Sequence, residues 1–402
     1  MRQKKGAGMN KENNREVETS GIKRSKYEID MCNGTIMDKL ISFALPLMLS
    51  GVLQLMFNAV DIIVVGRFTG SQALAAVGST SALINIFTNL FIGISLGSNV
   101  LAARFYAAGK SKEMSETVHT SITIALISGI IMAFVGAIFA KGALELMDTP
   151  DDVIDQSVLY MRIYFMGMPF FMLYNYGAAI LRAVGDTKRP LLFLIISGIT
   201  NAVLNLILVI VFGLGVAGVA IATVIAQLIS CVLVLTCLCR SQSSYRLYFN
   251  KLGIRRDYMV QIFKVGVPAG IQSVVINFSN ALLQSSVNSF GSTAMAGYTA
   301  ANNLLGFLYV SINSVTQACM SFTSQNLGVG KFKRMDRVLI DCIIFVSCCF
   351  NSYGKFILHI RQAAYRNIYI RCRGGKMWHG NTRIYNAYIF SLRNYGSYTW
   401  CP

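Results

Sequence analysis

Asp61 is an acidic residue inside a long apolar stretch of the chain, which is an unusual place for a charge. The stretch runs from Ile41 to Val65 and carries no other charged residue. A charged side chain in the middle of a membrane helix costs about 2.5–3.5 kcal/mol on insertion scales, so such acids usually face a cavity and mark an ion path. We therefore expect Asp61 to bind a coupling cation, H+ or Na+. The alternative is a structural acid paired with Arg67 or with an amide of a neighbouring helix.

Amide side chains add to the polar character of the apolar stretches. They recur at helical spacings of three and four residues, which place them on one face with Asp61 or on the matching face of a later stretch. The candidates for lining a substrate cavity are Gln54, Asn58, Asn277, Asn280 and Gln284. Asn201 and Asn205 form a further pair of this kind. The alternative is that these amides hydrogen-bond neighbouring helices, which is their commonest role in membranes.

The composition indicates a membrane protein. Hydrophobic residues make up 54% of the 402 residues and charged residues only 13%. Apolar runs of roughly 18 or more residues mark candidate spanning helices, because lipid offers no water to an unpaired backbone amide. The predicted spans are 41–65, 74–101, 120–142, 157–181, 191–213, 217–239, 260–288 and 296–320, with a shorter one at 338–352. The chain is therefore expected to be an all-α polytopic protein whose main partner is the lipid bilayer.

Lys and Arg follow the order of these spans, which argues against nucleic-acid binding despite a net charge of +18. They gather before the first span and in the loops after the second, fourth, sixth and eighth. The opposite loops hold Arg67 and Lys141, the latter among acids such as Glu145 and Asp151. The positive-inside bias predicts a multi-pass protein of the cell membrane with its N-terminus in the cytoplasm.

The residue pattern argues against a metal site and against a catalytic site. The ten cysteines are scattered without a CxxC pair, and His119, His359 and His379 lack metal-ligand spacing. An intramembrane aspartyl protease would need two facing carboxylates, and Asp61 is the only acid that lies inside an apolar span and not at a span end. We expect no metal, no cofactor and no enzymatic activity.

The chain contains an internal repeat that relates its first two spans to the seventh and eighth. The matches include Pro46 with Pro268, Asn58 with Asn280, Phe68 with Phe290, and Gly109-Lys110 with Gly330-Lys331. An even number of spans separates the copies, so both have the same orientation and the repeat is parallel. In transporters with this symmetry, two bundles rock against each other around a site between them.

Several motifs carry a family resemblance. They are ALPLMLSGVLQLMFNAVDIIVVGRFTG at 44–70, LRAVGDTKRP at 181–190, NAVLNLILVIVFGLGVAG at 201–218, and SQNLGVGK at 324–331, which echoes ARFYAAGK at 103–110. With these motifs the chain resembles the multidrug and toxic compound extrusion (MATE) family of cation-coupled efflux antiporters over about residues 36–345. The resemblance implies two six-helix bundles with a drug cavity between them.

The resemblance also implies a coupling site made of Asp61, Asn201 and Asn205. Asp61 stands where the family has its first-helix aspartate, and Asn201 and Asn205 stand on the fifth-helix pair. The second member of that pair is often Asp in one branch, and another branch has a glutamate on the seventh helix. This chain has Asn at 205 and no acid in 260–288, so the choice between H+ and Na+ stays open.

The domain organisation follows from the spans and from a change of pattern late in the chain. From about Lys355 no long apolar span appears, and shifted reading frames of YRNIYIRCRGG and YGSYTWCP yield family-like sequence. We therefore expect a chain truncated by a frameshift after about residue 350. The expected units are a disordered cytoplasmic tail (1–36), a complete first six-helix bundle (37–240), an inter-bundle loop (241–258), a partial second bundle with helices seven to nine (259–350) and an out-of-frame tail (351–402).

The predicted function is cation-coupled export of small organic, often cationic compounds by a monomeric antiporter. A lipid-linked precursor flippase of the same superfamily is one alternative, although it would be expected to carry several basic residues in its cavity and the spans are nearly free of them. A second alternative is a truncated relic of an efflux pump that no longer transports.

Overall fold

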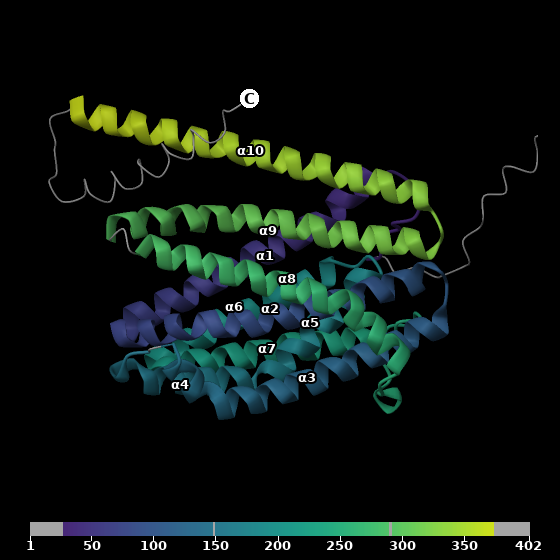
Figure 1. The fold of residues 1–402 in the computed structure, drawn as a ribbon, viewed down its shortest axis with the longest axis horizontal. Coiled ribbons are helices and arrows are strands. Elements are labelled where there is room, and N and C mark those ends of the chain that lie inside the picture. Colours follow the sequence, from purple (N-terminus) through teal and green to yellow (C-terminus); the bar gives the residue numbers. More distant parts are fainter. Residues whose placement is uncertain (1–26, 148, 289–291, 374–402) are drawn as a thin grey trace, which may run out of the picture.

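The computed structural model describes residues 27–147, 149–288 and 292–373, and all regular structure in this part of the chain is helical (Figure 1). The α-helices are α1 (Ile36–Phe68), α2 (Ser71–Ala107), α3 (Ser111–Glu145), α4 (Asp151–Met166), α5 (Met168–Ala183), α6 (Lys188–Leu206), α7 (Gly215–Arg240), α8 (Arg256–Asn288), α9 (Ser292–Gly328) and α10 (Phe332–Arg373). A π-helix, η1 (Ile207–Val211), extends α6, and a short 3-10 helix, η2 (Phe249–Lys251), precedes α8. The predicted all-α membrane fold is confirmed. Seven helices of the described residues are long and apolar enough to cross a membrane.

The predicted spans fall on these helices, with one difference. The span predicted at 157–181 is divided at Gly167 into α4 and α5, which have 16 residues each. Pro169 lies in the first turn of α5, where its missing N–H is tolerated. Gly167 also lies close to α7, because a Cβ added there would stand 2.6 Å from Oε1 of Gln227.

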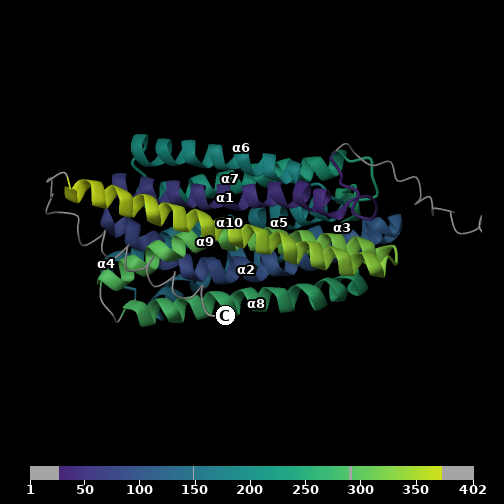
Figure 2. The same cartoon turned by 90° about the horizontal axis from the view of Figure 1, so that it is seen from above.

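The helices run back and forth between two ends of the molecule, to which we give names. The basic end, on the right in Figure 1, contains residues 27–35 and the loops at 108–110, 184–187, 241–255 and 329–331. The acidic end, on the left, contains the described loop residues 69–70, 146–147, 149–150 and 212–214. In the view from above, α6 and α8 lie at opposite edges of the helical array (Figure 2).

The helices form two units, α1–α7 and α8–α10, that meet where α2 crosses α8 and where α1 and α2 pack on α9. The α2–α8 crossing is made through glycines. A Cβ added to Gly93 would stand 2.2 Å from Cα of Gly270, and one added to Gly97 would stand 2.1 Å from the main-chain oxygen of Ile262. Small residues at such positions let membrane helices pack backbone to backbone.

A separate apolar cluster joins α1 to the second unit near the basic end. Leu40, Phe43 and Leu47 of α1 are buried against residues of α9 and α10. Phe43 packs edge-on against Phe322, with 5.8 Å between the ring centroids. Toward the acidic end of the same helix, Ile62 and Ile63 are exposed. The two units are therefore joined most closely in their basic-end halves.

The structure differs from the sequence prediction at the edges of the predicted units. Residues 27–35, assigned to a disordered tail, are packed between the two units, whereas 1–26 lie outside the described residues. Helix α10 continues through the predicted boundary at 350 to Arg373. Residues 374–402 of the predicted out-of-frame tail lie outside the described part of the chain.

Candidate functional site

Asp61 lies on α1 about two turns before the helix ends at the acidic end. Its side chain is half-buried, and its Oδ1 accepts a hydrogen bond from the side-chain amide of Asn205, at 2.5 Å. Arg67, the other candidate partner, is exposed. Among the described contacts, Asp61 therefore pairs with the interhelical amide. This contact joins α1 to the end of α6.

A chain of polar side chains continues from Asn205 into the first unit. Asn205 also points its amide toward Oδ1 of Asn201, at 3.3 Å. Asn201 in turn donates to Oγ1 of Thr223 on α7, at 3.3 Å. Asn201 and Asn205 are 7% and 0% exposed. The structure thus brings together the three residues predicted as a coupling site, Asp61, Asn201 and Asn205, and adds Thr223.

Three further residues surround this chain that the sequence analysis did not single out. Tyr160 and Tyr164 of α4 lie close enough to Asp61 to interact with it electrostatically, and Gln227 of α7 contacts Tyr164. The two tyrosine rings stack with 6.1 Å between their centroids. The sequence could have indicated the part of α7 that joins this network. Thr223 and Gln227 are four residues apart, which puts two polar side chains on one face of an apolar helix.

The atoms available for a ligand in this region are oxygens. Oδ1 of Asn205 and Oε1 of Gln227 are buried without a hydrogen-bond partner among the described residues. Together with the Asp61 carboxylate they offer acceptors and no second fixed charge. Oxygen donors of this kind suit a hard cation or a proton shared with a carboxylate. The π-helix η1 starts two residues after Asn205, and π turns often occur at functional sites.

The residues predicted to line a substrate cavity lie apart from this network. Gln54 and Asn58 are exposed on α1, and Asn280 is exposed on α8. Asn277 is half-buried and donates to the main-chain oxygen of Ser273 in its own helix, at 2.8 Å. The side chain of Gln284 lies outside the described set. Because polar groups are costly against lipid, the exposure of Gln54, Asn58 and Asn280 favours a water-facing surface between the units.

Buried polar contacts hold the two units together at the basic end. Gln325 of α9 donates to the main-chain oxygen of Ala183 at the end of α5, at 2.7 Å. One helical turn earlier, Ser321 donates to Oδ1 of Asn99 on α2, at 3.0 Å. The amide of Asn99 donates to the main-chain oxygen of Ala179, at 2.9 Å. Asn99, Ser321 and Gln325 are each at most 3% exposed. These contacts exclude water from the joint.

Residues 27–34, which we call the strap, add a second set of contacts across this joint. On the side of the second unit, the strap offers its main-chain oxygens. The contacts are Asn326 to Met31 at 3.1 Å, Lys331 to Cys32 at 3.0 Å and Arg334 to Gly34 at 2.8 Å. Met31 and Cys32 are buried. Two of these donors, Lys331 and Arg334, are charged, and hydrogen bonds from charged donors are stronger than neutral ones.

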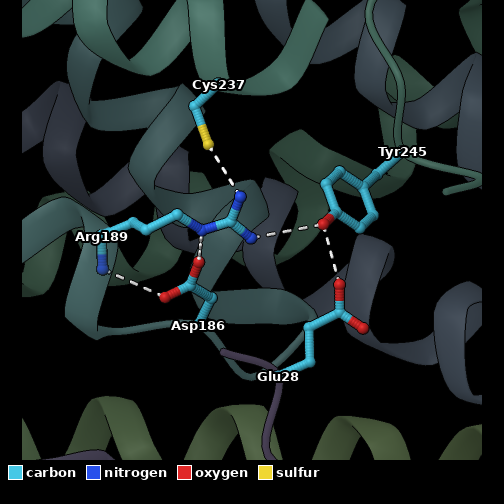
Figure 3. Close-up of polar contacts among 5 residues, drawn as sticks. All are labelled: Glu28, Asp186, Arg189, Cys237 and Tyr245. Atoms are coloured by element: carbon cyan, nitrogen blue, oxygen red, sulfur yellow. Dashed lines mark hydrogen bonds and ion pairs between the residues drawn. The ribbon is translucent and has the colours of Figure 1, made fainter. Parts of the chain in front are cut away.

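On the side of the first unit, Glu28 anchors the strap (Figure 3). Its carboxylate accepts from the hydroxyls of Tyr106 and Tyr245, at 2.7 and 2.8 Å. Burial raises the pKa of Tyr245, which keeps its hydroxyl protonated as a donor. The strap also runs against Gly185, whose φ is +98° and where an added Cβ would stand 2.6 Å from the main-chain oxygen of Ile29.

Arg189 extends this anchor into the first unit. It forms an ion pair with Asp186, whose side chain is fully buried. Its other guanidinium nitrogens point to Sγ of Cys237, at 3.1 Å, and to the hydroxyl of Tyr245, at 3.4 Å (Figure 3). The loop between α5 and α6 is thus fixed beneath the strap.

Comparisons with known proteins agree with this arrangement. A sequence profile for the family described as MatE matches residues 46–207 and 268–362. The chain is 35% identical to the probable multidrug resistance protein YoeA of Bacillus subtilis strain 168 over 306 residues, which are 74% of this chain and 66% of the relative. It is 28% identical to the probable multidrug resistance protein YpnP of the same strain over 318 residues, 76% and 68% of the two chains. The chain thus spans about two thirds of the length of these curated relatives.

Solved structures give the same fold at lower sequence identity. A MATE protein in the straight conformation superposes with a TM-score of 0.82 at 20% identity, covering 92% of this chain and 80% of that one. A multidrug resistance MATE family transporter in the outward-facing conformation superposes with a TM-score of 0.81, also at 20% identity and with the same coverage.

Proposed function

The chain belongs to the MatE family of multidrug efflux transporters, and on that premise we propose that it is a cation-coupled antiporter that exports organic compounds across the cell membrane. The coupling ion is H+ or Na+, and it binds at Asp61 with the help of Asn201 and Asn205. YoeA and YpnP are both named as probable multidrug resistance proteins. Their names support small organic compounds as substrates of this chain.

The contact between Asp61 and Asn205 carries this proposal. It places a carboxylate of one membrane helix against a fully buried amide of another, next to buried oxygens that have no partner among the described residues. An ion that binds Asp61 changes the charge between α1 and α6, and thereby changes the relative stability of their arrangements. Coupling requires such a link between ion binding and helix position.

An antiporter must also open its binding site to one side of the membrane at a time, and the two ends of the molecule differ in a way that supports this. The basic end is closed by buried contacts such as Gln325 with Ala183, whereas Asn58 and Asn280 are exposed farther along α1 and α8. The positive-inside bias favours a cytoplasmic location for the basic end. In this arrangement the coupling ion reaches Asp61 from outside the cell. Export requires a second state in which the basic end opens toward the cytoplasm.

An efflux assay tests the export function. The full chain is produced in cells deficient in their own efflux pumps, and the accumulation of a fluorescent organic cation is compared among the wild type, Asp61→Asn and Asp155→Asn. Asp155 is exposed on α4, so its substitution is a matched control. We expect the wild type and Asp155→Asn to lower dye accumulation and Asp61→Asn to lose this activity at equal amounts in the membrane. Export by Asp61→Asn at the normal rate would remove Asp61 from the mechanism, and a folded wild type that exports nothing would overturn the function.

Reconstituted vesicles identify the ion. Purified protein is placed in liposomes with either a pH gradient without Na+ or a Na+ gradient at equal pH, and dye movement is followed. The gradient that drives uptake names the coupling ion. Equal movement with and without both gradients contradicts coupled transport.

A further inference from the structure

A second polar site lies at the basic end, on the outer side of α3. It is a cavity of about 640 Å³ between the first turns of α3 and the loop that connects the two units. The lining residues that matter for its chemistry are Lys112, Glu116 and His119 of α3 and Lys251 and Arg255 of the loop. The cavity is separate from the Asp61 network, which lies toward the acidic end.

Side chains of α3 fix the loop that forms the outer wall of the cavity. Nε2 of His119 accepts from the main-chain N–H of Tyr248, at 3.1 Å, while its Nδ1 contacts the main-chain oxygen of Ser115, at 2.6 Å. The N–H of Gly253 donates to Thr123, at 3.1 Å, and that of Arg255 donates to Thr120, at 3.3 Å. The cavity is therefore preformed by hydrogen bonds to the loop backbone. These bonds do not use the charged side chains of the loop, although the ammonium of Lys251 stands 4.9 Å from the ring centroid of Tyr248.

The charge of the cavity wall is predominantly positive. Lys112, Lys251 and Arg255 line it together with one acid, Glu116. Arg246 adds a further positive charge nearby, where its guanidinium stands 5.0 Å from the ring centroid of Tyr248. A wall of this kind selects an anion, and Lys and Arg are the usual ligands of phosphate groups.

The position of the cavity along the helices indicates which anion reaches it. On α3 the exposed apolar surface begins at Ile127 and continues through Ile130 and Ile131, two turns beyond His119. On α8 it begins at Val260, just over one turn beyond Arg255. The basic residues thus lie where the hydrocarbon surface ends, at the level of lipid headgroups.

The loop itself has the character of a segment at a membrane surface. Phe249 and Ile254 are exposed on either side of Lys251. Apolar side chains that alternate with basic ones in this way insert into the boundary between headgroups and acyl chains. A water-soluble anion would not account for their exposure.

From these observations we propose that the cavity binds the headgroup of an anionic phospholipid, with Lys112, Lys251 and Arg255 around its phosphate and the acyl chains along Ile127, Ile130 and Ile131 of α3. Basic pockets on the cytoplasmic side of membrane helices are suited to such headgroups. The site would tie the inter-bundle loop to the anionic leaflet of the membrane.

Native mass spectrometry of the full-length protein tests the proposal. Phosphatidylglycerol and phosphatidylcholine with the same acyl chains are added in detergent, and the lipid retained by the protein is counted. We expect the wild type to retain phosphatidylglycerol preferentially, and Lys251→Gln with Arg255→Gln to weaken that retention roughly tenfold or more. Both side chains are exposed, so the variant is expected to fold, and Lys112→Gln provides an independent second variant.

Two controls make the outcomes decisive. Lys141→Gln removes a charge from a cavity of about 430 Å³ at the acidic end, and it should leave the retention unchanged. Glycerol 3-phosphate, added alone, separates a lipid site from a site for soluble phosphate. Equal retention of both lipids, unchanged retention in the Lys251 and Arg255 variant, or displacement of phosphatidylglycerol by glycerol 3-phosphate each overturns the proposal.

Discussion

The side-chain amide of Gln325 on α9 donates to the main-chain oxygen of Ala183 at the end of α5, at 2.7 Å. The contact joins the two units, and Gln325 is 1% exposed. A buried main-chain oxygen that loses its donor costs about 1–3 kcal/mol. The closed arrangement of the basic end is therefore held by interactions that must be broken together when this end opens.

The strap should be released when its charged donors are removed. In a variant that keeps Cys32 as its single cysteine, we expect Lys331→Gln with Arg334→Gln to increase the rate at which a water-soluble maleimide labels Cys32. Charge-assisted hydrogen bonds contribute about 1.5–3 kcal/mol each, so an increase of about tenfold or more is expected. Lys333→Gln is the control, because Lys333 is an exposed neighbour. Equally slow labelling in all variants would mean that these donors do not hold the strap.

Asn205 should be needed for transport and less so for folding. In Asn205→Leu the Asp61 carboxylate loses its donor, and since hydrogen bonds to charged groups are worth about 1.5–3 kcal/mol, we expect coupled dye export to fall roughly tenfold or more. Thr223→Val affects the far end of the chain of polar contacts, so a smaller decrease is expected. Export rates at equal membrane amounts measure both, and an Asn205→Leu protein as active as the wild type contradicts the assignment.

The glycine crossing should tolerate no side chain. A Cβ at position 97 would stand 2.1 Å from the main-chain oxygen of Ile262, so Gly97→Ala should force α2 and α8 apart at a cost of about 1–3 kcal/mol. A lower Tm in detergent is the expected result. Gly78→Ala on the same helix is the control, because a Cβ there meets nothing within 4 Å; its Tm should stay equal or rise.

Arg189 should stabilise the loop beneath the strap. Arg189→Leu leaves Asp186 buried without its cation, and breaking a buried ion pair in this way costs about 3–5 kcal/mol. The neighbouring Lys188 is exposed, so Lys188→Leu should change the free energy of unfolding by about 0.5 kcal/mol or less. Thermal unfolding of the two variants in the same detergent compares them, and equal Tm values would contradict a stabilising role for the pair.

The sequence was sufficient to predict the positions of the helices, because the bilayer requires long apolar segments whatever their tertiary contacts. The resemblance to the MATE family is confirmed by the profile match. The break at Gly167 was not predicted. Proline alone does not determine such a break, since Pro46 and Pro268 lie within the unbroken helices α1 and α8. The close approach of α7 to Gly167 is a tertiary feature that local sequence does not encode.

The candidate site was predictable in part. Asp61, Asn201 and Asn205 were found because charges and amides are rare in apolar spans, and the structure joins them by hydrogen bonds. Tyr160 and Tyr164 gave no comparable signal, because aromatic residues are common in membrane helices. The strap was missed since most of its contacts with the second unit are made by main-chain oxygens, which every sequence supplies.

The glycine crossing has a mechanical consequence. Where α2 meets α8, Gly93 and Gly97 bring main-chain atoms of the two helices into direct contact, with no side chain of their own in between. Two surfaces of this kind can roll over each other with little repacking, whereas interdigitated side chains would have to change rotamer at every step. The two units can therefore tilt relative to each other most easily about the contact of Gly93 with Gly270. A methyl group added there would push the helices apart and would also slow their relative motion.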